Sequence, residues 1–206
     1  MRQPGEIFTF GHSTHGWSRF VELLKSAEVT AIADVRSSPY SRHTPQFDQK
    51  ALVDSLRREG IAYVFLGREL GGRPRHTYLF SDGVADYEKM ASVDDFRAGL
   101  ARVIEGSSRF RISLMCTERD PLDCHRCLLV SRRLAERGIA IRHLLADGEI
   151  EGHSDTEERL LASTQLSHGD LLATRAERLI AAYRHRSRQV AFTEPSLHAR
   201  SSVPAQ

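Results

Sequence analysis

Short apolar segments alternate with amphipathic segments along most of this chain, and this alternation constrains the fold more than any other feature. Five segments have the length and apolar content of buried strands: residues 7–10, 31–35, 61–66, 110–115 and 139–145. Strands separated by helices favour a parallel sheet covered on both faces. The sequence therefore predicts an α/β fold, a three-layer sandwich around a mostly parallel five-stranded sheet with helices on both faces and the Rossmann-like strand order 3-2-1-4-5.

The predicted helices are recognised by apolar residues at helical spacing and by the residues at their ends. They cover residues 17–27, 47–58, 84–105 with an interruption near 91–92, 124–137, 155–161 and 169–188. Gly60 and Gly138 are typical of helix C-termini, Ser92 with Asp95 resembles a capping box, and Asp155 or Ser154 is the expected N-cap of its helix. Residues 67–82 are rich in Gly, Arg and Pro, which predicts a long loop.

The length and the cysteine content limit the class of protein. A chain of 206 residues fits one α/β domain over residues 1–190, with a disordered tail over 191–206. The sequence contains no apolar run of membrane-spanning length and no apolar signal segment, so we expect no membrane partner. The three cysteines are an odd number clustered between positions 116 and 127. Reduced thiols of this kind predict a cytoplasmic protein.

Positive charge is concentrated near the C-terminus. Residues 171–206 contain six arginines and two acidic residues, whereas the whole chain has a net charge of +2. The body of the chain is therefore nearly neutral, which argues against a globally polybasic nucleic-acid binder. The arginines of the helix at 169–188 fit a solvated face or a local nucleic-acid contact.

Polar and reactive side chains follow three of the predicted strands at the point where each strand ends. They are His12 and Ser13 after the first strand, Asp34, Arg36 and Ser41 after the second, and Cys116, Glu118, His125 and Arg126 after the fourth. A glycine-rich loop with Gly71 and Gly72 follows the third. In open parallel sheets the ligand crevice lies beyond the carboxyl ends of the strands. The expected strand order makes the second, first and fourth strands neighbours, which predicts that their three clusters meet in one crevice.

Five short motifs occur in order along the chain. They are Gly11-His12-Ser13, then Asp34 with Arg36, Pro39 and Ser41, then Leu70-Gly71-Gly72, then Cys116 with Glu118, and finally Cys124-His125-Arg126. In this order they resemble the family called domain of unknown function 488, over about residues 6–150 and on to Tyr183. The resemblance implies an α/β domain and marks as motif positions His12, Ser13, Asp34, Arg36, Cys116, Glu118, His125 and Arg126. Cys127 is outside this pattern.

These residue types favour acid/base chemistry on a phosphorylated, nucleoside-like or nucleic-acid substrate. We expect Glu118 to act as acid/base and Asp34 as a general base or ribose acceptor, with Cys116 and His125 beside them. Paired carboxylates also suit cleavage of a glycosidic bond. The expected anion-binding residues are His12, Ser13, Arg36, Ser41, Gly71, Gly72 and Arg126, because guanidinium and hydroxyl groups bind phosphate or carboxylate.

Two other functions fit the same residues. Cys116, Cys124 and His125 are ligand types for zinc or iron, which would indicate a metal-binding or redox protein. No cofactor is the main expectation, because adjacent Cys124 and His125 at a helix start seldom reach one ion. A non-catalytic module that binds small anions or nucleic acid is the other alternative. Residue by residue, Cys116 also fits a small apolar core position, Asp34 with Arg36 a plain ion pair, and His12 a buried, satisfied histidine.

Overall fold

The computed structural model describes residues 5–164 and 173–194, and its centre is a mixed sheet of six strands. The strands are β1 (Ile7–Gly11), β2 (Ala31–Asp34), β3 (Ala62–Phe65), β6 (Ile112–Cys116), β7 (Ile141–Leu144) and β8 (Ile150–Gly152). Their order is β3-β2-β6-β1-β7-β8, and all neighbours are parallel except β7 and β8. A mostly parallel α/β sheet is thus confirmed.

The predicted number and order of strands are wrong. β6 lies between β2 and β1. In the Rossmann-like order, β1 would instead lie between β2 and β6. Every residue of β6 is buried, as in a central strand, but an apolar run indicates burial and not which strands are neighbours. The sixth strand, β8, is only three residues long and returns antiparallel after a turn in which Gly148 has φ 107°.

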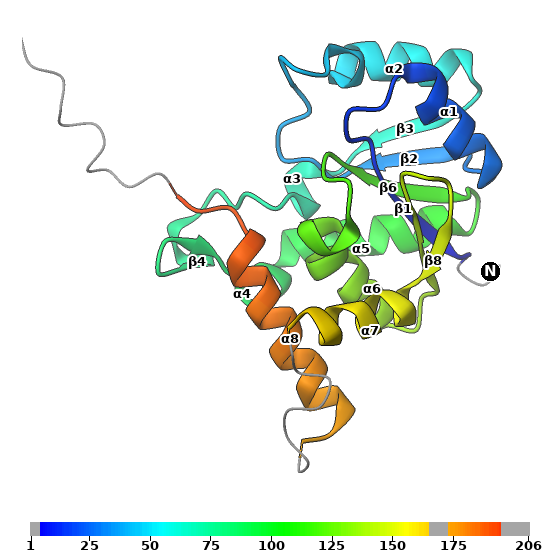
Figure 1. Ribbon diagram of the computed structural model, residues 1–206. Coiled ribbons are helices and arrows are strands. Elements are labelled where there is room, and N and C mark those ends of the chain that lie inside the picture. The colour runs from blue at the N-terminus through cyan, green and yellow to red at the C-terminus, as the bar shows by residue number, and fades with distance from the viewer. Residues whose placement is uncertain (1–4, 165–172, 195–206) are drawn as a thin grey trace, which may run out of the picture.

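Helices cover both faces of the sheet (Figure 1). On one face lie α1 (Trp17–Ser26) and α2 (Gln49–Arg58), which pack Phe20, Leu24 and Leu52 against β1 and β2. On the other lie α5 (Asp94–Ser107), α6 (Arg132–Ala135), α7 (His153–Ser163) and α8 (Arg175–Val190). Because side chains alternate along a strand, the two cores share the same strands without mixing.

The segment between β3 and β6 contains more structure than the predicted loop and helix. It forms α3 (Gly67–Leu70), a 3-10 turn η2 (Thr77–Leu79), the hairpin β4 (Phe80–Ser81) and β5 (Val84–Ala85), and α4 (Tyr87–Ala91). The expected capping box at Ser92 is wrong, because α5 begins after Val93 without a side-chain cap. Asp86 instead caps α4 by accepting hydrogen bonds from the amides of Glu88 and Lys89.

Between β6 and β7 the chain forms three short helical segments. They are a 3-10 turn η3 (Pro121–Asp123), a π-helical segment η4 (Arg126–Ser131) and α6. Another 3-10 turn, η1 (Pro45–Phe47), precedes α2. Gly60 and Gly138 follow α2 and α6 with φ of 72° and 78°, as helix-ending glycines do. The caps expected at Ser154 and Asp155 are wrong, because α7 begins at His153 after Gly152.

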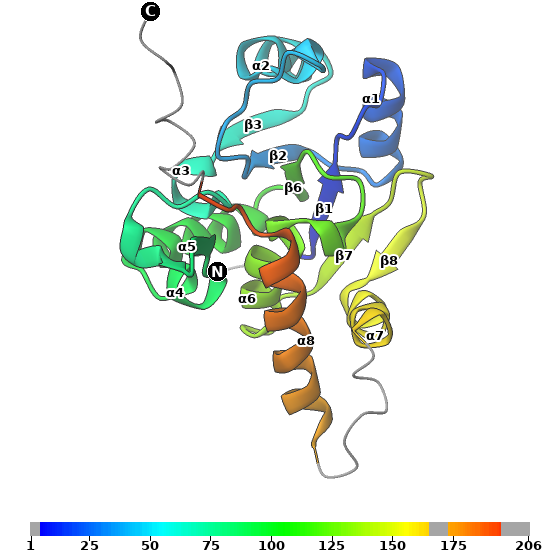
Figure 2. The same cartoon turned by 60° about the vertical axis from the view of Figure 1, so that its left-hand side comes forward.

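The last described helix, α8, lies against α7 and η4 (Figure 2). It begins after Thr174, which forms a capping box with Glu177; residues 169–172 of the predicted helix lie outside the described residues. Residues 191–194, expected in the tail, pair with the hairpin through a bridge between Val84 and Thr193. The rest of the predicted tail, 195–206, is also outside the described part. Across residues 5–164 and 173–194, every helix is too short or too polar to cross a membrane.

Candidate functional site

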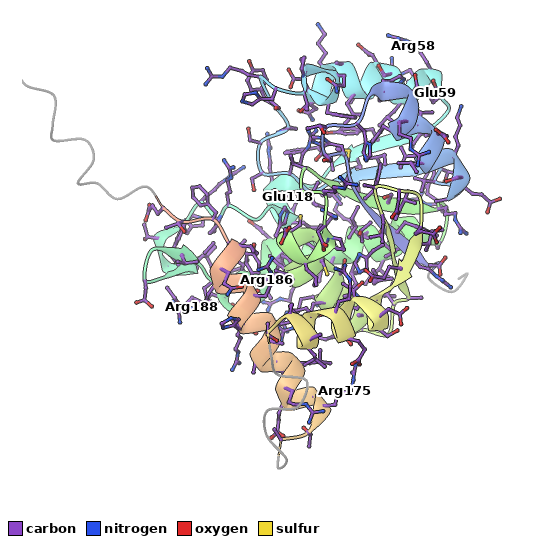
Figure 3. The ribbon with its side chains drawn as sticks, in the orientation of Figure 1. Arg58, Glu59, Glu118, Arg175, Arg186 and Arg188 are labelled. Carbon is purple, nitrogen blue, oxygen red and sulfur yellow. The ribbon has the colours of Figure 1, made fainter. Side chains whose placement is uncertain are left out.

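A pocket of about 360 Å³ opens beyond the carboxyl ends of β2 and β6. Its walls come from the segments that follow β2, β3 and β6, from α4, and from the end of α8. Glu118 stands on the loop after β6, near the C-terminal half of α8 that carries Arg186 (Figure 3). The residues that line the pocket are Arg36, Ser37, Ser38, Tyr40, Ser41, Gly72, Arg73, Tyr87, Cys116, Thr117, Glu118, Asp123, His125, Val190 and Phe192.

The structure brings only part of the predicted site into this pocket. Six expected residues line it: Arg36, Ser41, Gly72, Cys116, Glu118 and His125. The other five, which are His12, Ser13, Asp34, Gly71 and Arg126, do not. The expectation that the ends of the first, second and fourth strands form one crevice is therefore wrong in part. With β6 next to β2, the pocket lies over β3, β2 and β6, and the end of β1 falls to one side.

Asp34 lies beneath the pocket and holds Arg36. Its side chain is fully buried, and it accepts hydrogen bonds from Arg36 Nε at 2.9 Å and Arg36 Nη2 at 2.7 Å. Tyr63 also donates to Asp34, over 2.9 Å. This bidentate geometry fixes the guanidinium plane at the pocket wall. Asp34 is thus placed to position Arg36 rather than to touch a ligand.

His12 supports Arg36 from the other side. Its Nδ1 donates to the Ser13 carbonyl at 2.9 Å, which leaves Nε2 to accept from Arg36 Nη1 at 3.3 Å. The ring stacks on Phe47 with centroids 4.3 Å apart. Burial, reinforced by the charge of Arg36, lowers the pKa of His12 to about 4. His12 is therefore a neutral, satisfied core histidine at neutral pH.

Four potential ligand groups meet at the pocket: Cys116, Glu118 and His125 line it, and the buried Cys124 lies beside them. Their donor atoms all lie within 4.8 Å of one another. His125 Nε2 donates to the Val35 carbonyl at 2.9 Å, so Nδ1 faces Cys116 Sγ and Cys124 Sγ, each at 3.8 Å. Cys124 Sγ lies 3.0 Å from Glu118 Oε2, within hydrogen-bond distance. We call these four residues the thiol cluster.

Arg126 lies under the thiol cluster and shapes its electrostatics. Its side chain is 1% exposed and donates to the carbonyls of Glu118 at 2.6 Å and Arg119 at 3.1 Å. Its Nε has no hydrogen-bond partner in the described part of the chain. This buried guanidinium holds the Glu118 loop by its backbone and is not itself at the pocket surface.

Burial and charge act differently on the members of the thiol cluster. Burial raises the pKa of the Cys116 thiol well above its ordinary value. Burial alone would also raise that of Cys124, but a hydrogen bond from Cys116 and the charges of Arg126 and His125 outweigh it and lower the pKa. Partial desolvation of its carboxylate by the surrounding pocket, together with the charge of Cys124, raises the pKa of Glu118. Of the two thiols, Cys124 therefore loses its proton more readily than Cys116.

The pocket rim contains residues that the sequence analysis missed. Arg73 is exposed and its guanidinium lies 5.0 Å from the Phe192 ring centroid. Tyr40 lines the pocket with 65% of its surface exposed. Both stand next to residues of the motifs, Arg73 directly after Gly72 and Tyr40 directly before Ser41. Phe192 belongs to the segment that composition assigns to the tail, so no sequence signal indicates its position.

The arginines of α8 are mostly held by the protein itself. Arg186 pairs with Asp123 and donates to the Leu122 carbonyl, Arg188 pairs with Asp82, and Arg175 pairs with Glu158. These pairs dock the helix onto the body. They also leave less unpaired positive charge on α8 than its sequence suggests.

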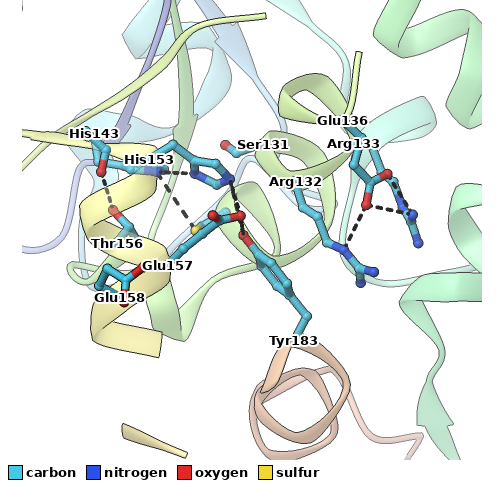
Figure 4. Close-up of polar contacts among 12 residues, drawn as sticks. Ser131, Arg132, Arg133, Glu136, His143, His153, Thr156, Glu157, Glu158 and Tyr183 are labelled. Carbon is cyan, nitrogen blue, oxygen red and sulfur yellow. Dashed lines mark hydrogen bonds and ion pairs between the residues drawn. The ribbon is translucent and has the colours of Figure 1, made fainter. Parts of the chain in front are cut away.

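A second group of ligand types, Cys127, His143 and His153, is buried where η4, β7 and α7 meet; Figure 4 shows His143 and His153. Tyr183 donates to Glu157 at 3.2 Å and can then accept from His153 Nε2 at 3.2 Å. His153 Nδ1 lies 2.9 Å from His143 Nε2, and His143 Nδ1 lies 2.8 Å from the Thr9 hydroxyl. When each group donates to the next, from Thr9 through the two histidines and Tyr183 to Glu157, every donor and acceptor in this network has a partner. The group is thus complete without an ion.

Comparison with known protein families matches residues 16–133 to the family described as "Domain of unknown function DUF488". This match covers more than half of the chain and includes every member of the thiol cluster. It begins after His12 and Ser13 and ends before α7 and α8. No curated protein and no solved structure gives a significant match to the chain.

Proposed function

This chain belongs to the family described as "Domain of unknown function DUF488", and we propose that it is a hydrolytic enzyme using Glu118 in acid/base chemistry on a phosphorylated, nucleoside-like substrate. The substrate is a small nucleotide or a single-stranded end of a nucleic acid. One observation carries the proposal: the pocket joins a carboxylate, Glu118, to an exposed guanidinium, Arg73, and an exposed aromatic ring, Tyr40.

The chemistry of the rim supports this class of substrate. Within the described residues, Arg73 has no carboxylate at ion-pair distance, so its charge is available to a phosphate. An aromatic side chain with an exposed face stacks on nucleobases of any sequence. The hydroxyls of Ser38 and Ser41, which also line the pocket, add donors for phosphate or ribose oxygens.

Glu118 supports the reaction better than Asp34 does. Glu118 is exposed at the pocket, whereas both Asp34 oxygens are engaged by Arg36 and Tyr63 in the interior. In the proposed step Glu118 removes a proton from a water molecule, and the oxygen of that water molecule attacks the substrate. The proton then passes to the departing oxygen or nitrogen atom, so the enzyme returns to its starting state.

The proposal is tested with a panel of nucleotides and short oligonucleotides. Ligands are first found by the rise in thermal midpoint, because binding to the native state stabilises it. Products of those ligands are then measured for the wild type, Glu118→Gln, Arg73→Ala and the exposed control Glu105→Gln. We expect Glu118→Gln to lower kcat by about 10²–10⁴-fold while binding persists. Arg73→Ala should raise KM, and Glu105→Gln should match the wild type.

Other results would support a binding module or a thiol-based reaction instead of the proposed enzyme. Salt-sensitive binding without turnover by the wild type would show a binding module instead of an enzyme. Turnover that survives Glu118→Gln but is lost in Cys116→Ser would assign the chemistry to the thiol. If no member of the panel changes the thermal midpoint, the assignment of a nucleoside-like substrate is wrong.

A further inference from the structure

The thiol cluster has the donor set and the geometry of a metal centre. We propose that Cys116, Cys124 and His125 bind one zinc ion, which leaves a fourth position facing Glu118 and the pocket. Two cysteines and one histidine with one open position are a known ligand set for catalytic zinc. The inference goes beyond the proposed function, because an ion held by these side chains does not depend on which substrate enters the pocket.

The distances between the donor atoms fit a tetrahedral ion. Zinc–sulfur and zinc–nitrogen bonds of about 2.3 and 2.0–2.1 Å place tetrahedral ligand atoms roughly 3.5–3.8 Å apart. His125 Nδ1 is 3.8 Å from both Cys116 Sγ and Cys124 Sγ. Both nitrogen–sulfur separations are therefore already close to those that zinc requires, and the two sulfur atoms lie within 4.8 Å of each other.

The backbone explains how adjacent Cys124 and His125 reach the same point. The sequence alone suggests a common helix start, which would turn the two side chains apart. In the structure Cys124 is extended, with φ −137° and ψ 139°, and only His125 adopts helical angles. This change of conformation between η3 and η4 lets both side chains face Cys116 at the end of β6.

The groups around the cluster match the outer shell of a zinc site. A histidine ligand normally donates its other ring nitrogen to a carbonyl or carboxylate, which leaves a lone pair for the metal. His125 Nε2 donates to the Val35 carbonyl at 2.9 Å and leaves Nδ1 for the ion. The Arg126 amide nitrogen lies 3.3 Å from Cys124 Sγ, as expected of a donor to a metal thiolate.

Charge balance gives an independent reason for an ion here. The buried Arg126 guanidinium donates to carbonyl oxygens, and its Nε lacks a partner within the described residues. Two thiolates, the Glu118 carboxylate, Arg126 and a divalent cation together carry no net charge. Buried charges are tolerated when they are compensated in this way. Cys127, His143 and His153 offer a contrast, because their hydrogen bonds already close without an ion.

The chain contains a matched control for the test. The full-length protein is purified without an affinity tag under a thiol reductant, and its zinc content and zinc affinity are measured by mass spectrometry and chelator competition. We expect about one zinc per chain for the wild type, and at least about 10²-fold weaker affinity for Cys116→Ser and Cys124→Ser. Cys127→Ser, three residues away and buried outside the cluster, should bind zinc like the wild type.

A second measurement does not depend on folded variants. Cobalt added to the reduced, metal-free wild type should give thiolate-to-metal charge-transfer absorption and the visible bands of a tetrahedral ion. Absence of these bands together with absence of zinc would overturn the proposal, as would equal loss of zinc in Cys127→Ser and Cys124→Ser. Glu118→Gln should keep its zinc, so loss of turnover in that variant and loss of the metal are separate outcomes.

Discussion

At the scale of single residues, the backbone under the site is packed so closely that one methyl group matters. Gly11 ends β1, and a Cβ built there would lie 1.8 Å from the Glu118 carbonyl oxygen. That carbonyl accepts the Arg126 hydrogen bond at 2.6 Å. The absence of a side chain at Gly11 thus lets the Glu118 loop, more than a hundred residues away along the chain, pack against the end of β1.

Gly11→Ala should therefore destabilise the protein, by about 1–3 kcal/mol, which is the usual effect of forcing an extra methyl group into a packed interior. Urea denaturation gives the free energy of unfolding. Gly16→Ala is the control, since a Cβ at Gly16 meets nothing within 4 Å. Equal stability of the two variants would contradict the packing described around Glu118.

Asp34 gives a second prediction at this scale. Asp34→Ala leaves the buried guanidinium of Arg36 without its charge partner, so we expect a loss of about 3–5 kcal/mol. Asp94→Ala removes the partner of Arg97 in a pair whose carboxylate is 95% exposed, and should change stability by less than about 1 kcal/mol. Denaturation curves for both variants distinguish a positioning role of Asp34 from a solvated ion pair.

At the scale of elements, a buried hydroxyl adds to the arginine pairs that hold α8 on the body. Tyr183 donates to Glu157 and accepts from His153, so it connects α8 to α7 and, through His143, to β7 (Figure 4). The guanidinium of Arg132 lies 4.7 Å from the centre of the same ring. The periodicity of the sequence predicts α8. It does not predict that the buried face of α8 packs on His153, which is 30 positions away from Tyr183 along the chain.

Tyr183→Phe should cost about 1–3 kcal/mol, because the buried His153 Nε2–H then lacks an acceptor. Thermal or urea unfolding measures the effect. Tyr78→Phe is the matched control, since Tyr78 is 62% exposed and packs on His76 at the surface. Binding of zinc and of pocket ligands should be unchanged in both variants; a shift of either in Tyr183→Phe would link this network to the site.

Sequence reasoning at this scale predicts most elements but few of their caps. The five longer strands and α1, α2, α5, α7 and α8 lie close to their predicted positions, because an apolar repeat is a local property. Asp155 fails as a cap because an acidic side chain also occurs inside a first turn, whereas Ser92 follows α4 as its C-terminal cap. β8 and the hairpin of β4 and β5 are too short to give a periodic signal.

At the scale of the whole molecule, strand order is what the sequence leaves open, and it decides which motif residues share the pocket. The loops after β2 and β6 lie near each other in either order, which is why Arg36, Cys116 and Glu118 line the same pocket. His12 and Ser13 do not, since their placement depends on β1 lying beside β2. The choice between an isolated thiol and a cluster likewise needs the conformation of Cys124, which spacing does not give.

Stability of the whole molecule should depend on pH through its buried histidines. The folded pKa of His12 is about 4, below the ordinary value of 6.5, so between these values only the unfolded chain binds the proton. The free energy of unfolding should thus be highest above about pH 6.5 and fall by roughly 3 kcal/mol as the pH drops toward 4. Burial lowers the pKa of His143 and His153 as well, in the same direction.

Urea denaturation between about pH 8 and 4.5 measures this slope. His12→Gln removes the proton-binding group, so its stability should vary less with pH in the same window. The acidic groups whose pKa is lowered, such as Asp86 and Asp120, lose their stabilising charge only at lower pH, so they do not produce this slope. An equal slope in His12→Gln and the wild type would assign the effect to the other histidines.

The wall that Val190 and Phe192 give to the pocket comes from beyond residues 16–133, the part matched to the family. The four ligand groups of the thiol cluster lie inside that part. One wall of the pocket and the thiol cluster thus come from separate stretches of the chain. Exchanging residues 190–192 would therefore change this wall of the pocket and leave the side chains of the thiol cluster as they are.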